Sequence, residues 1–256
     1  MYSLKNKSAI ITGASSGIGL AAAKLFAKSG AQLIISGRRA DLLHDLVSAI
    51  DSEGGVAIAV AGDVTDPDHA QACVDMAMDR FGRLDIAFNN AGSTGAMAPA
   101  ADLSIEDWQE TINTNLTSAF MAAKAQIPAM TSTGGGSLIF TSSFVGHTVG
   151  FPGMAAYGAA KAGVNGLVQI LAAELGQSNI RVNALLPGGT DTPSNVANAP
   201  GAAPETRGFV EGLHALKRMA APEEIASAAL YLASNASSFM TGTAMLVDGG
   251  VSIYRT

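Results

Sequence analysis

The sequence predicts one α/β domain over residues 1–256, with a doubly wound parallel sheet of about seven strands and helices on both faces. Short runs rich in Ile, Leu and Val alternate along the chain with longer helical patterns. Strands that are apolar throughout are typical of a parallel sheet that helices cover on both sides. Right-handed crossovers between such strands make the doubly wound topology the expected one. No internal repeat or linker divides the chain, so we expect a single domain.

Four expected strands lie in the first half of the chain, and a helical pattern follows each of them. Ser8–Thr12 is apolar up to a glycine-rich turn, and residues 20–29 follow it as a helix. Ser104 and Asp107 have the spacing of a helix cap, which predicts a helix from there to about residue 127, with Pro128 near its end. The other expected strands are 32–36, Val56–Ala61 and 84–88, and the other expected helices are 40–53 and 67–82.

The second half continues this alternation. Strands are expected at 137–142, 180–186 and 243–247, and helices at 155–176 and 222–234. Residues 188–204 are rich in Gly, Pro, Asn and Thr, which favour turns and irregular backbone. We therefore interpret residues 188–213 as a mobile loop over a binding site, and not as a domain boundary.

The composition excludes several classes of protein. Hydrophobic residues make up 48% of the chain and charged residues 14%, so a large core can form and wholesale disorder is excluded. The net charge of −6 argues against nucleic acid or an anionic membrane as the main partner. No apolar run approaches the roughly 20 residues of a membrane span, and the only cysteine, Cys73, has no internal disulfide partner. A lone cysteine fits a reducing compartment, so we expect a cytoplasmic protein. The histidines lack metal-ligand spacing, so we expect no metal site.

A glycine-rich turn between the first strand and the first helix predicts a site for the pyrophosphate of a dinucleotide. Glycines let the backbone turn tightly and approach a phosphate, and a helix N-terminus offers free N–H groups and a positive dipole end. Gly17, Gly19 and Ala22 have the G-x-G-x-x-A spacing. No Lys-Ser/Thr pair follows them, which disfavours a nucleoside-triphosphate loop. The candidate cofactor contacts here are Gly13, Ser15, Ser16, Gly17, Ile18 and Gly19.

The end of the second strand bears on the choice between NAD and NADP. In NAD-binding units an acidic residue usually stands there and binds the ribose, whereas this chain has Gly37 followed by Arg38 and Arg39. An arginine can hold a 2′-phosphate with two hydrogen bonds, and an acid would repel it. We therefore predict NADP as the cofactor and regard NAD as less favoured, with Arg38 as the main contact and Arg39 as the second. The alternative is that both arginines only begin a solvated helix.

Ser143, Tyr157 and Lys161 are the candidate reacting residues. Tyr157 and Lys161 are four residues apart in the expected helix and therefore share one of its faces. A free tyrosine has a pKa of about 10, so a base near neutrality needs a pKa lower by roughly 3 units, which corresponds to about 4 kcal/mol. A nearby ammonium group in a dry pocket can supply this, and Lys161 is the only Asp, Glu, Lys or Arg between residues 125 and 173. The alternative is a core helix with an amphipathic tyrosine and a lysine that reaches solvent.

Taken in order, these motifs resemble the short-chain dehydrogenase/reductase family almost from end to end. Any single motif is weak, but all of them in sequence at this chain length are very specific. The resemblance implies a Rossmann fold and an NAD(P)-dependent oxidoreductase. The matching segments are Thr12 to Gly19, Asp63-Val64, Asn89 to Gly92, Asn115, Ser143, Tyr157-x-x-x-Lys161, Pro187-Gly188 and Val247 to Gly250.

The resemblance also implies a role for each catalytic position. Ser143 would hydrogen-bond the substrate oxygen, and Tyr157 would exchange its proton with that oxygen. Lys161 would bind the nicotinamide ribose and lower the pKa of Tyr157. Asn115 would hold a water molecule that links Lys161 to solvent. These four residues form the expected catalytic set.

On the cofactor side, the resemblance implies contacts beyond the glycine-rich turn. Asp63 and Val64 would meet the adenine, and Thr192 would face the carboxamide. The turn after the fourth strand would support both the cofactor and the central strand. The implied set is completed by Asn89, Ala91, Gly92, Tyr157, Lys161, Pro187, Gly188 and Thr190.

The chain departs from the family pattern at three places. Ser143 precedes Tyr157 by 14 residues, where 13 is common, so Ser142 is a rival for the serine role. Ser16 stands where many NADP-dependent members carry Arg or Lys. Gly189-Thr190 replaces a pair that is often bulkier, which makes this turn more flexible.

We expect a reductase or dehydrogenase that acts on a small carbonyl or alcohol. Residues 188–213 carry no basic cluster, which favours a neutral, apolar ketone or secondary alcohol over a polyanion. Met97, Phe144, Phe151 and Met154 are expected either to line an apolar substrate wall or only to close the core beneath their loops.

Two alternatives remain open. A 3-oxoacyl-[acyl-carrier-protein] reductase usually presents basic residues to its acidic carrier, and neither 130–133 nor 172–174 contains one. A catalytically silent cofactor-binding regulator is disfavoured by the complete catalytic set.

Helix 155–176 is apolar nearly all round, which suggests that a partner helix covers part of it. Family members often form tetramers through this helix and the helix that contains Asn115. We therefore expect a homotetramer.

Overall fold

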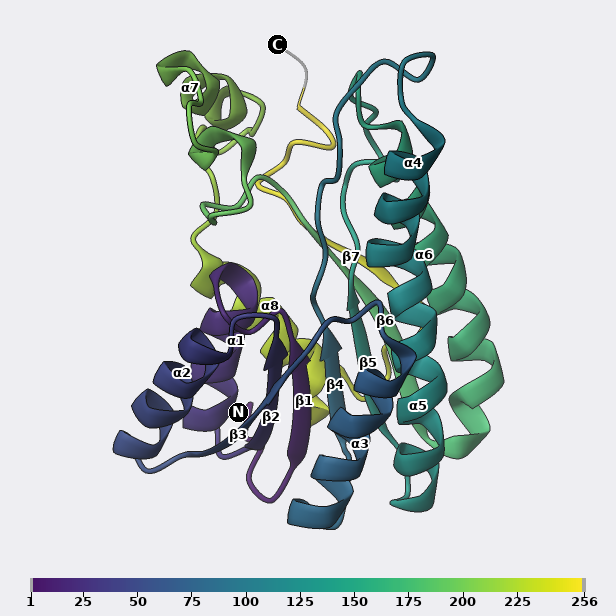
Figure 1. Ribbon diagram of the computed structural model, residues 1–256. Coiled ribbons are helices and arrows are strands. Elements are labelled where there is room, and N and C mark those ends of the chain that lie inside the picture. The colour runs from purple at the N-terminus through teal and green to yellow at the C-terminus, as the bar shows by residue number, and fades with distance from the viewer. Residues whose placement is uncertain (1, 255–256) are drawn as a thin grey trace.

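The computed structural model describes residues 2–254 and confirms the doubly wound α/β fold (Figure 1). All strands belong to one seven-stranded sheet of order β3-β2-β1-β4-β5-β6-β7, and every neighbouring pair is parallel. The strands are β1 Ser8–Thr12, β2 Gln32–Gly37, β3 Val56–Ala61, β4 Ile86–Asn89, β5 Gly136–Thr141, β6 Ile180–Pro187 and β7 Ala244–Val247.

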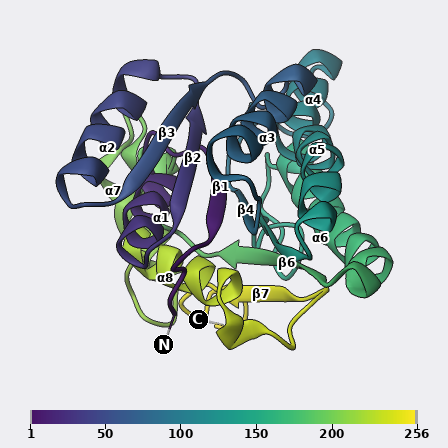
Figure 2. The same ribbon diagram turned by 90° about the horizontal axis from the view of Figure 1, so that it is seen from below.

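The α-helices pack in two layers, one on each face of the sheet (Figure 2). Helices α1, α2 and α8 cover one face, and α3, α5 and α6 cover the other. Alternation along β1 explains why both faces are apolar, because Ile10 packs on the second layer and Ile11 on the first. The bounds are α1 Gly17–Lys28, α2 Ala40–Ser52, α3 Pro67–Phe81, α4 Ile105–Ile112, α5 Ser118–Ser132, α6 Ala155–Leu175, α7 Pro204–Gly212 and α8 Pro222–Ala233.

The helix that was expected to start after Ser104 differs from the prediction in two ways. Its cap is as expected, because the Asp107 N–H donates to Ser104 Oγ at 3.0 Å. However, a π-helical turn, Asn113–Thr117, separates α4 from α5, and Pro128 lies inside α5, which continues to Ser132. Ala129 and Met130 beyond the proline are buried, so packing outweighs the one backbone hydrogen bond that the proline cannot donate.

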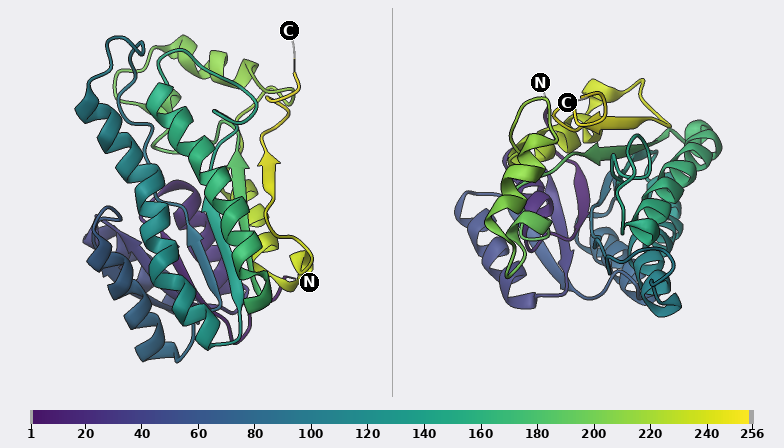
Figure 3. Two further views of the ribbon diagram at one scale, coloured as in Figure 1. Left: turned by 90° about the vertical axis from the view of Figure 1, so that its right-hand side faces the viewer. Right: turned by 90° about the horizontal axis from the view of Figure 1, so that it is seen from above.

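We expect residues 188–213 to form a loop. The structure instead contains a short 3-10 turn, Val196–Asn198, and helix α7 in this segment. The prediction is wrong there because it assigns Pro204 to the loop, whereas Pro204 occupies the first turn of α7, where a proline costs no hydrogen bond. This segment lies beyond the carboxyl ends of the strands (Figure 3). Within residues 2–254, no helix has both the length and the apolar character that a membrane crossing requires.

The strand order reverses between β1 and β4, which are neighbours in the middle of the sheet. In sheets of this kind a ligand binds beyond the carboxyl ends of the strands at such a switch point. The expected site residues therefore converge there from elements far apart in the sequence.

Candidate active site

The glycine-rich turn after β1 is closely packed, and three of its positions favour glycine over any other residue. Gly13 and Gly17 have positive φ angles of 68° and 55°. A Cβ atom at Gly19 would overlap the backbone carbonyl of Gly13. Only glycine allows this approach of the turn to the start of α1.

The first turn of α1 fits an anionic group. Ser16 is the N-cap residue, yet its side chain makes no capping hydrogen bond, so the free N–H groups of this turn have no side-chain acceptor there. Instead, Arg39 Nη2 donates to Ser15 Oγ at 2.8 Å and to Ser16 Oγ at 2.9 Å. A guanidinium group thus stands beside N–H groups that favour negative charge.

The two arginines after β2 are placed differently from each other. Arg39 bridges to the glycine-rich turn, whereas Arg38 is 81% exposed and its Nη1 lies 3.9 Å from Asp63 Oδ2. Asp63 follows β3, and hydrogen bonds from the Thr65 N–H and hydroxyl hold the pKa of its carboxyl below the usual value. Arg39, which had been ranked second, is therefore the arginine in direct contact with the turn.

The turn after β4 is fastened to β1. Thr12 Oγ1 accepts the N–H groups of Asn90 at 3.0 Å and Ala91 at 3.1 Å. The Asn89 side chain exchanges two hydrogen bonds of 2.9 Å with buried Gln126 on α5. Asn89 therefore supports the turn from within the protein.

The π-helical turn brings Asn115 to the same turn. Asn115 Nδ2 donates to the carbonyls of Ser93 at 2.8 Å and Thr111 at 2.9 Å, and Asn115 Oδ1 accepts the Ser93 N–H at 3.2 Å. A Cβ atom at Gly92 would lie 2.7 Å from Asn115 Oδ1 and 3.3 Å from Lys161 Nζ. Gly92, Asn115 and Lys161 thus meet at one point.

Ser143, Tyr157 and Lys161 also come together. The Tyr157 hydroxyl interacts with the Ser143 side chain, whose Oγ also accepts the Val145 N–H at 3.1 Å, and Lys161 Nζ lies 5.7 Å from the centroid of the Tyr157 ring. Lys161 is only 3% exposed, and its Nζ donates to the Thr141 carbonyl at 2.8 Å. The rival Ser142 donates its hydroxyl to the Lys161 carbonyl at 2.9 Å, so its hydroxyl is engaged by the backbone of α6.

Burial controls the charges of this group. It lowers the pKa of Lys161 from 10.5 to about 8, because a charged ammonium is costly away from water. It also raises the pKa of Tyr157, although the interaction with Ser143 opposes this. Among residues 2–254, no carboxylate forms an ion pair with Lys161. The expected lowering of the tyrosine pKa by Lys161 is not found in this structure, because desolvation by burial is the largest influence on Tyr157.

The turn after β6 lies against the glycine-rich turn. A Cβ atom at Gly188 would lie 2.7 Å from Asp248 Cα, so Pro187 and Gly188 pack closely on the segment after β7. Thr190 Oγ1 donates to the Gly188 carbonyl at 3.1 Å. A Cβ atom at Gly17 would lie 3.0 Å from Thr192 Cγ2, which places Thr192 directly over the phosphate end of the site.

An apolar pocket of about 430 Å³ is lined by residues on both sides of Tyr157 in the sequence, Ala155 and Gly158, although Tyr157 itself is not part of the lining, and no Asp, Glu, Lys, Arg or His side chain lines it. Phe144 is buried with Val145 and Val251, and Tyr157 packs on this cluster. Met97 is 51% exposed and is not part of the lining. The lining residues are Pro99, Ala100, Val145, Gly146, Gly150, Phe151, Pro152, Gly153, Met154, Ala155 and Gly158.

Several contacts had no signal in the sequence. The Thr141 carbonyl that binds Lys161 belongs to the backbone, and Gln126 resembles any other helical glutamine. Val251 and Leu213 join the cluster around Phe144 from distant segments. Within residues 2–254, no group of three His, Cys, Asp or Glu side chains is placed to hold a metal ion.

Comparison with known proteins supports an oxidoreductase. A family model described as enoyl-(acyl carrier protein) reductase matches residues 13–252. The 3β-hydroxysteroid dehydrogenase 1 of Eggerthella lenta is 38% identical over 98% of this chain and 95% of its own. The cyclohexanol dehydrogenase of Acinetobacter sp. strain SE19 is 37% identical over 95% and 94%. A crystal structure of a short-chain type dehydrogenase/reductase from Mycobacterium marinum superposes with a TM-score of 0.92, at 36% identity and 99% and 98% coverage.

Proposed function

The chain belongs to the short-chain dehydrogenase/reductase family, and from that premise we propose that it is an NADP(H)-preferring enzyme that interconverts a neutral, apolar ketone and its secondary alcohol. Family membership makes it an oxidoreductase of hydroxyl and carbonyl groups. The observation that carries the proposal is the contact of Tyr157 with Ser143, beside the buried ammonium of Lys161.

Each residue of this group has a distinct part in the proposed reaction. A bound nicotinamide dinucleotide supplies or accepts the hydride. Tyr157, whose pKa is raised by burial, holds its proton at neutral pH and can donate it to a carbonyl oxygen. Ser143 interacts with the Tyr157 hydroxyl and can orient the same oxygen. With a pKa of about 8, Lys161 is mostly protonated near neutrality, and its charge favours the tyrosinate that donation leaves.

The preference for NADP rests on positive charge where a 2′-phosphate would lie. Gly37 takes the place of an acid at the end of β2, and Arg38 and Arg39 follow it. Arg39 is already oriented by Ser15 and Ser16, so its guanidinium needs little rearrangement to bind a phosphate. We infer that Arg39 contributes at least as much as Arg38, because the nearby Asp63 partly offsets the charge of Arg38.

The substrate class rests on the apolar pocket. A charged group in it would lose water without gaining a partner, and this is costly. Relatives are named for cyclohexanol and for a 3β-hydroxysteroid, whose names denote ring alcohols. Other relatives are named for 4-hydroxycyclohexanecarboxylates, so the names favour a ring alcohol, and only the uncharged lining of the pocket favours a neutral one.

NADPH oxidation across a panel of carbonyl compounds tests the function. Cyclic ketones should be turned over, and a carboxylated ring ketone or a 3-oxoacyl-carrier-protein thioester should react far more slowly. Tyr157→Phe should lower kcat by about 10²–10⁴-fold, the usual contribution of a general acid, while the Kd for NADPH stays close to wild type. Tyr2→Phe, near the N-terminus, where Tyr2 packs edge to face on Tyr231, is the matched control. Turnover by Tyr157→Phe within about tenfold of wild type would refute the assignment.

Titration of the wild-type protein with NADPH and with NADH tests the cofactor preference. NADPH should bind more tightly than NADH, and Arg39→Ala should reduce this difference by removing a charged hydrogen-bond donor. Equal Kd values for NADPH and NADH in the wild-type protein would contradict the preference.

A further inference from the structure

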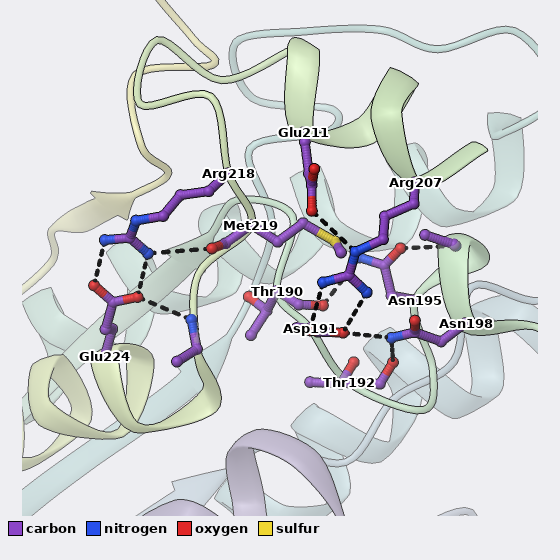
Figure 4. A network of polar contacts seen from close by, with 12 residues as sticks. Thr190, Asp191, Thr192, Asn195, Asn198, Arg207, Glu211, Arg218, Met219 and Glu224 are labelled. Atoms are coloured by element: carbon purple, nitrogen blue, oxygen red, sulfur yellow. Dashed lines mark hydrogen bonds and ion pairs between the residues drawn. The ribbon is translucent and has the colours of Figure 1, made fainter. Parts of the chain in front are cut away.

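The chain between β6 and α8 forms two limbs that face each other (Figure 4). The first limb is residues 189–192, and the second limb is residues 204–214, which include α7. We propose that Arg207 is a positioning residue that fastens the outer part of the second limb to the first. It thereby fixes the position of the apolar cluster around Phe144, at the substrate end of the site, relative to the glycine-rich turn, at the cofactor end. The assignment of a substrate end and a cofactor end to this site rests on the proposed function.

Arg207 joins the limbs through a two-pronged contact with Asp191, here called the Arg207–Asp191 fork. Arg207 Nη2 donates to Asp191 Oδ2 at 2.8 Å, and Nη1 donates to Oδ1 at 3.4 Å. This is the geometry in which arginine holds a carboxylate most specifically. Asn198 Nδ2 donates to Asp191 Oδ1 at 2.8 Å and to the Thr192 carbonyl at 2.9 Å, so the acceptor is itself held in place.

The base of the two limbs is joined separately by His214, which is only 2% exposed. The Gly189 N–H donates to His214 Nε2 at 2.9 Å, so the ring proton lies on Nδ1 and is donated to the Val210 carbonyl at 2.8 Å. A Cβ atom at Gly189 would lie 2.7 Å from His214 Cε1, which shows how closely the base is packed. The fork therefore sets the relative position of the outer parts of the two limbs, whereas His214 fixes their base.

The first limb carries the cofactor end of this arrangement. Its backbone is fixed to residue 220, because the Asp191 N–H donates to the Ala220 carbonyl and the Ala220 N–H to the Gly189 carbonyl, both at 2.9 Å. The side chain of Thr192 lies over Gly17 in the glycine-rich turn. The first limb thus offers Arg207 an anchor that is already rigid.

The second limb carries the substrate end. Leu213, the residue after α7, packs on the cluster of Phe144 and Val145 against which Tyr157 also packs. Helix α7 has only nine residues, which is too short for stability by itself. Val210 is its one buried residue, and Phe209 is 63% exposed. Its position therefore depends on the fork and on the base.

Arg207 has a second partner that supplies a matched control. Its Nε donates to Glu211 Oε1 at 3.0 Å, one turn along the same helix. Arg207→Gln removes both contacts, Asp191→Asn weakens the fork and can also alter the hydrogen bond from Asn198, and Glu211→Gln weakens only the contact within α7 by removing its ion pair. A role in joining the limbs requires the first two variants to behave alike and the third to resemble wild type.

The first readout is hydrogen–deuterium exchange, which does not depend on turnover. Arg207→Gln and Asp191→Asn should increase exchange in residues 204–213 and leave α8 unchanged, whereas Glu211→Gln should have little effect outside its own turn. Equal exchange in all three variants and wild type would overturn the proposal, whether or not an active substrate is found.

The second readout is kinetic. Both side chains of the fork are about half exposed, so the substrate KM should rise by only about two- to fivefold in Arg207→Gln, with kcat nearly unchanged. The double variant Arg207→Gln/Asp191→Asn should be no worse than either single variant. Raising the salt from about 0.05 M to about 1 M should bring the wild-type KM toward that of Arg207→Gln. Additive effects of the two substitutions would refute a shared role. Absence of turnover in every variant would instead count against the proposed function.

Discussion

At the scale of single residues, Lys161 is the costliest feature of the site. It is buried and has no carboxylate partner among the described residues; its ammonium donates to one backbone carbonyl, that of Thr141. A charge buried in this way destabilises the fold, and active sites commonly contain such groups. The sequence indicated an isolated lysine beside Tyr157, and the structure adds that desolvation shifts the pKa values of both.

Lys161→Met gives a test of this cost through its dependence on pH. Burial lowers the pKa of Lys161 from 10.5 to about 8, so between these values the folded protein binds fewer protons than the unfolded chain. The free energy of unfolding of the wild type, relative to the variant, should therefore rise with pH across this window, by up to about 3 kcal/mol. Below about pH 8 the difference should be constant, because Lys161 is protonated in both states.

Urea unfolding of both proteins between about pH 7 and pH 10 measures this difference. Burial raises the pKa of Tyr157, so the folded proteins keep its proton over this range and it contributes little to the difference. A difference that does not change with pH would mean that the ammonium is not desolvated in the folded protein.

At the scale of elements, irregular backbone places the catalytic groups. The π-helical turn Asn113–Thr117 contains one extra residue per turn, and this aims Asn115 at Gly92 and Lys161. Hydrophobic periodicity predicted a single helix here, because an insertion of this kind hardly changes the apolar pattern. In the same way, α7 was missed because nine residues with one buried side chain carry almost no periodic signal.

The contact between β1 and α1 leads to a second prediction. Gly19→Ala should destabilise the protein by about 1–3 kcal/mol and weaken NADPH binding, because its Cβ would overlap the rigid Gly13 carbonyl. Gly208→Ala in α7 is the matched control, since a Cβ there meets nothing within 4 Å. It should stabilise the protein by up to about 1 kcal/mol. Thermal unfolding of the two variants compares them directly, and equal effects would contradict the packing argument.

At the scale of the whole molecule, the strand order brings distant residues to one edge. Gly13, Asp63, Gly92, Ser143 and Gly188 each follow a different strand, and parallel strands all end on the same side of the sheet.

The outer surface of the second helix layer carries exposed apolar side chains. Phe120 on α5 and Ile170 on α6 are 53% and 60% exposed, which is unusual for large apolar side chains on neighbouring helices.

We expect these two helices to pack against a second copy in a homotetramer. Sedimentation velocity at micromolar concentration should show a tetramer, and Phe120→Glu or Ile170→Glu should shift it to smaller species. Val56→Glu, at an exposed apolar position on the distant edge strand β3, should leave the assembly intact. A stable wild-type monomer would rule out this assembly.

The sequence by itself determined the sheet, its helix layers and the shared helix face of Tyr157 and Lys161, because apolar periodicity, glycine spacing and the i, i+4 rule are local properties. The family resemblance added Ser143 to this pair. The tertiary structure alone decided which arginine contacts the glycine-rich turn, that Ser142 is engaged by α6, that the pKa of Tyr157 is raised, and that Arg207 joins two limbs. Each of these depends on distances between segments far apart in the chain and on the desolvation that their packing causes. Such quantities cannot be read from the residue types at single positions.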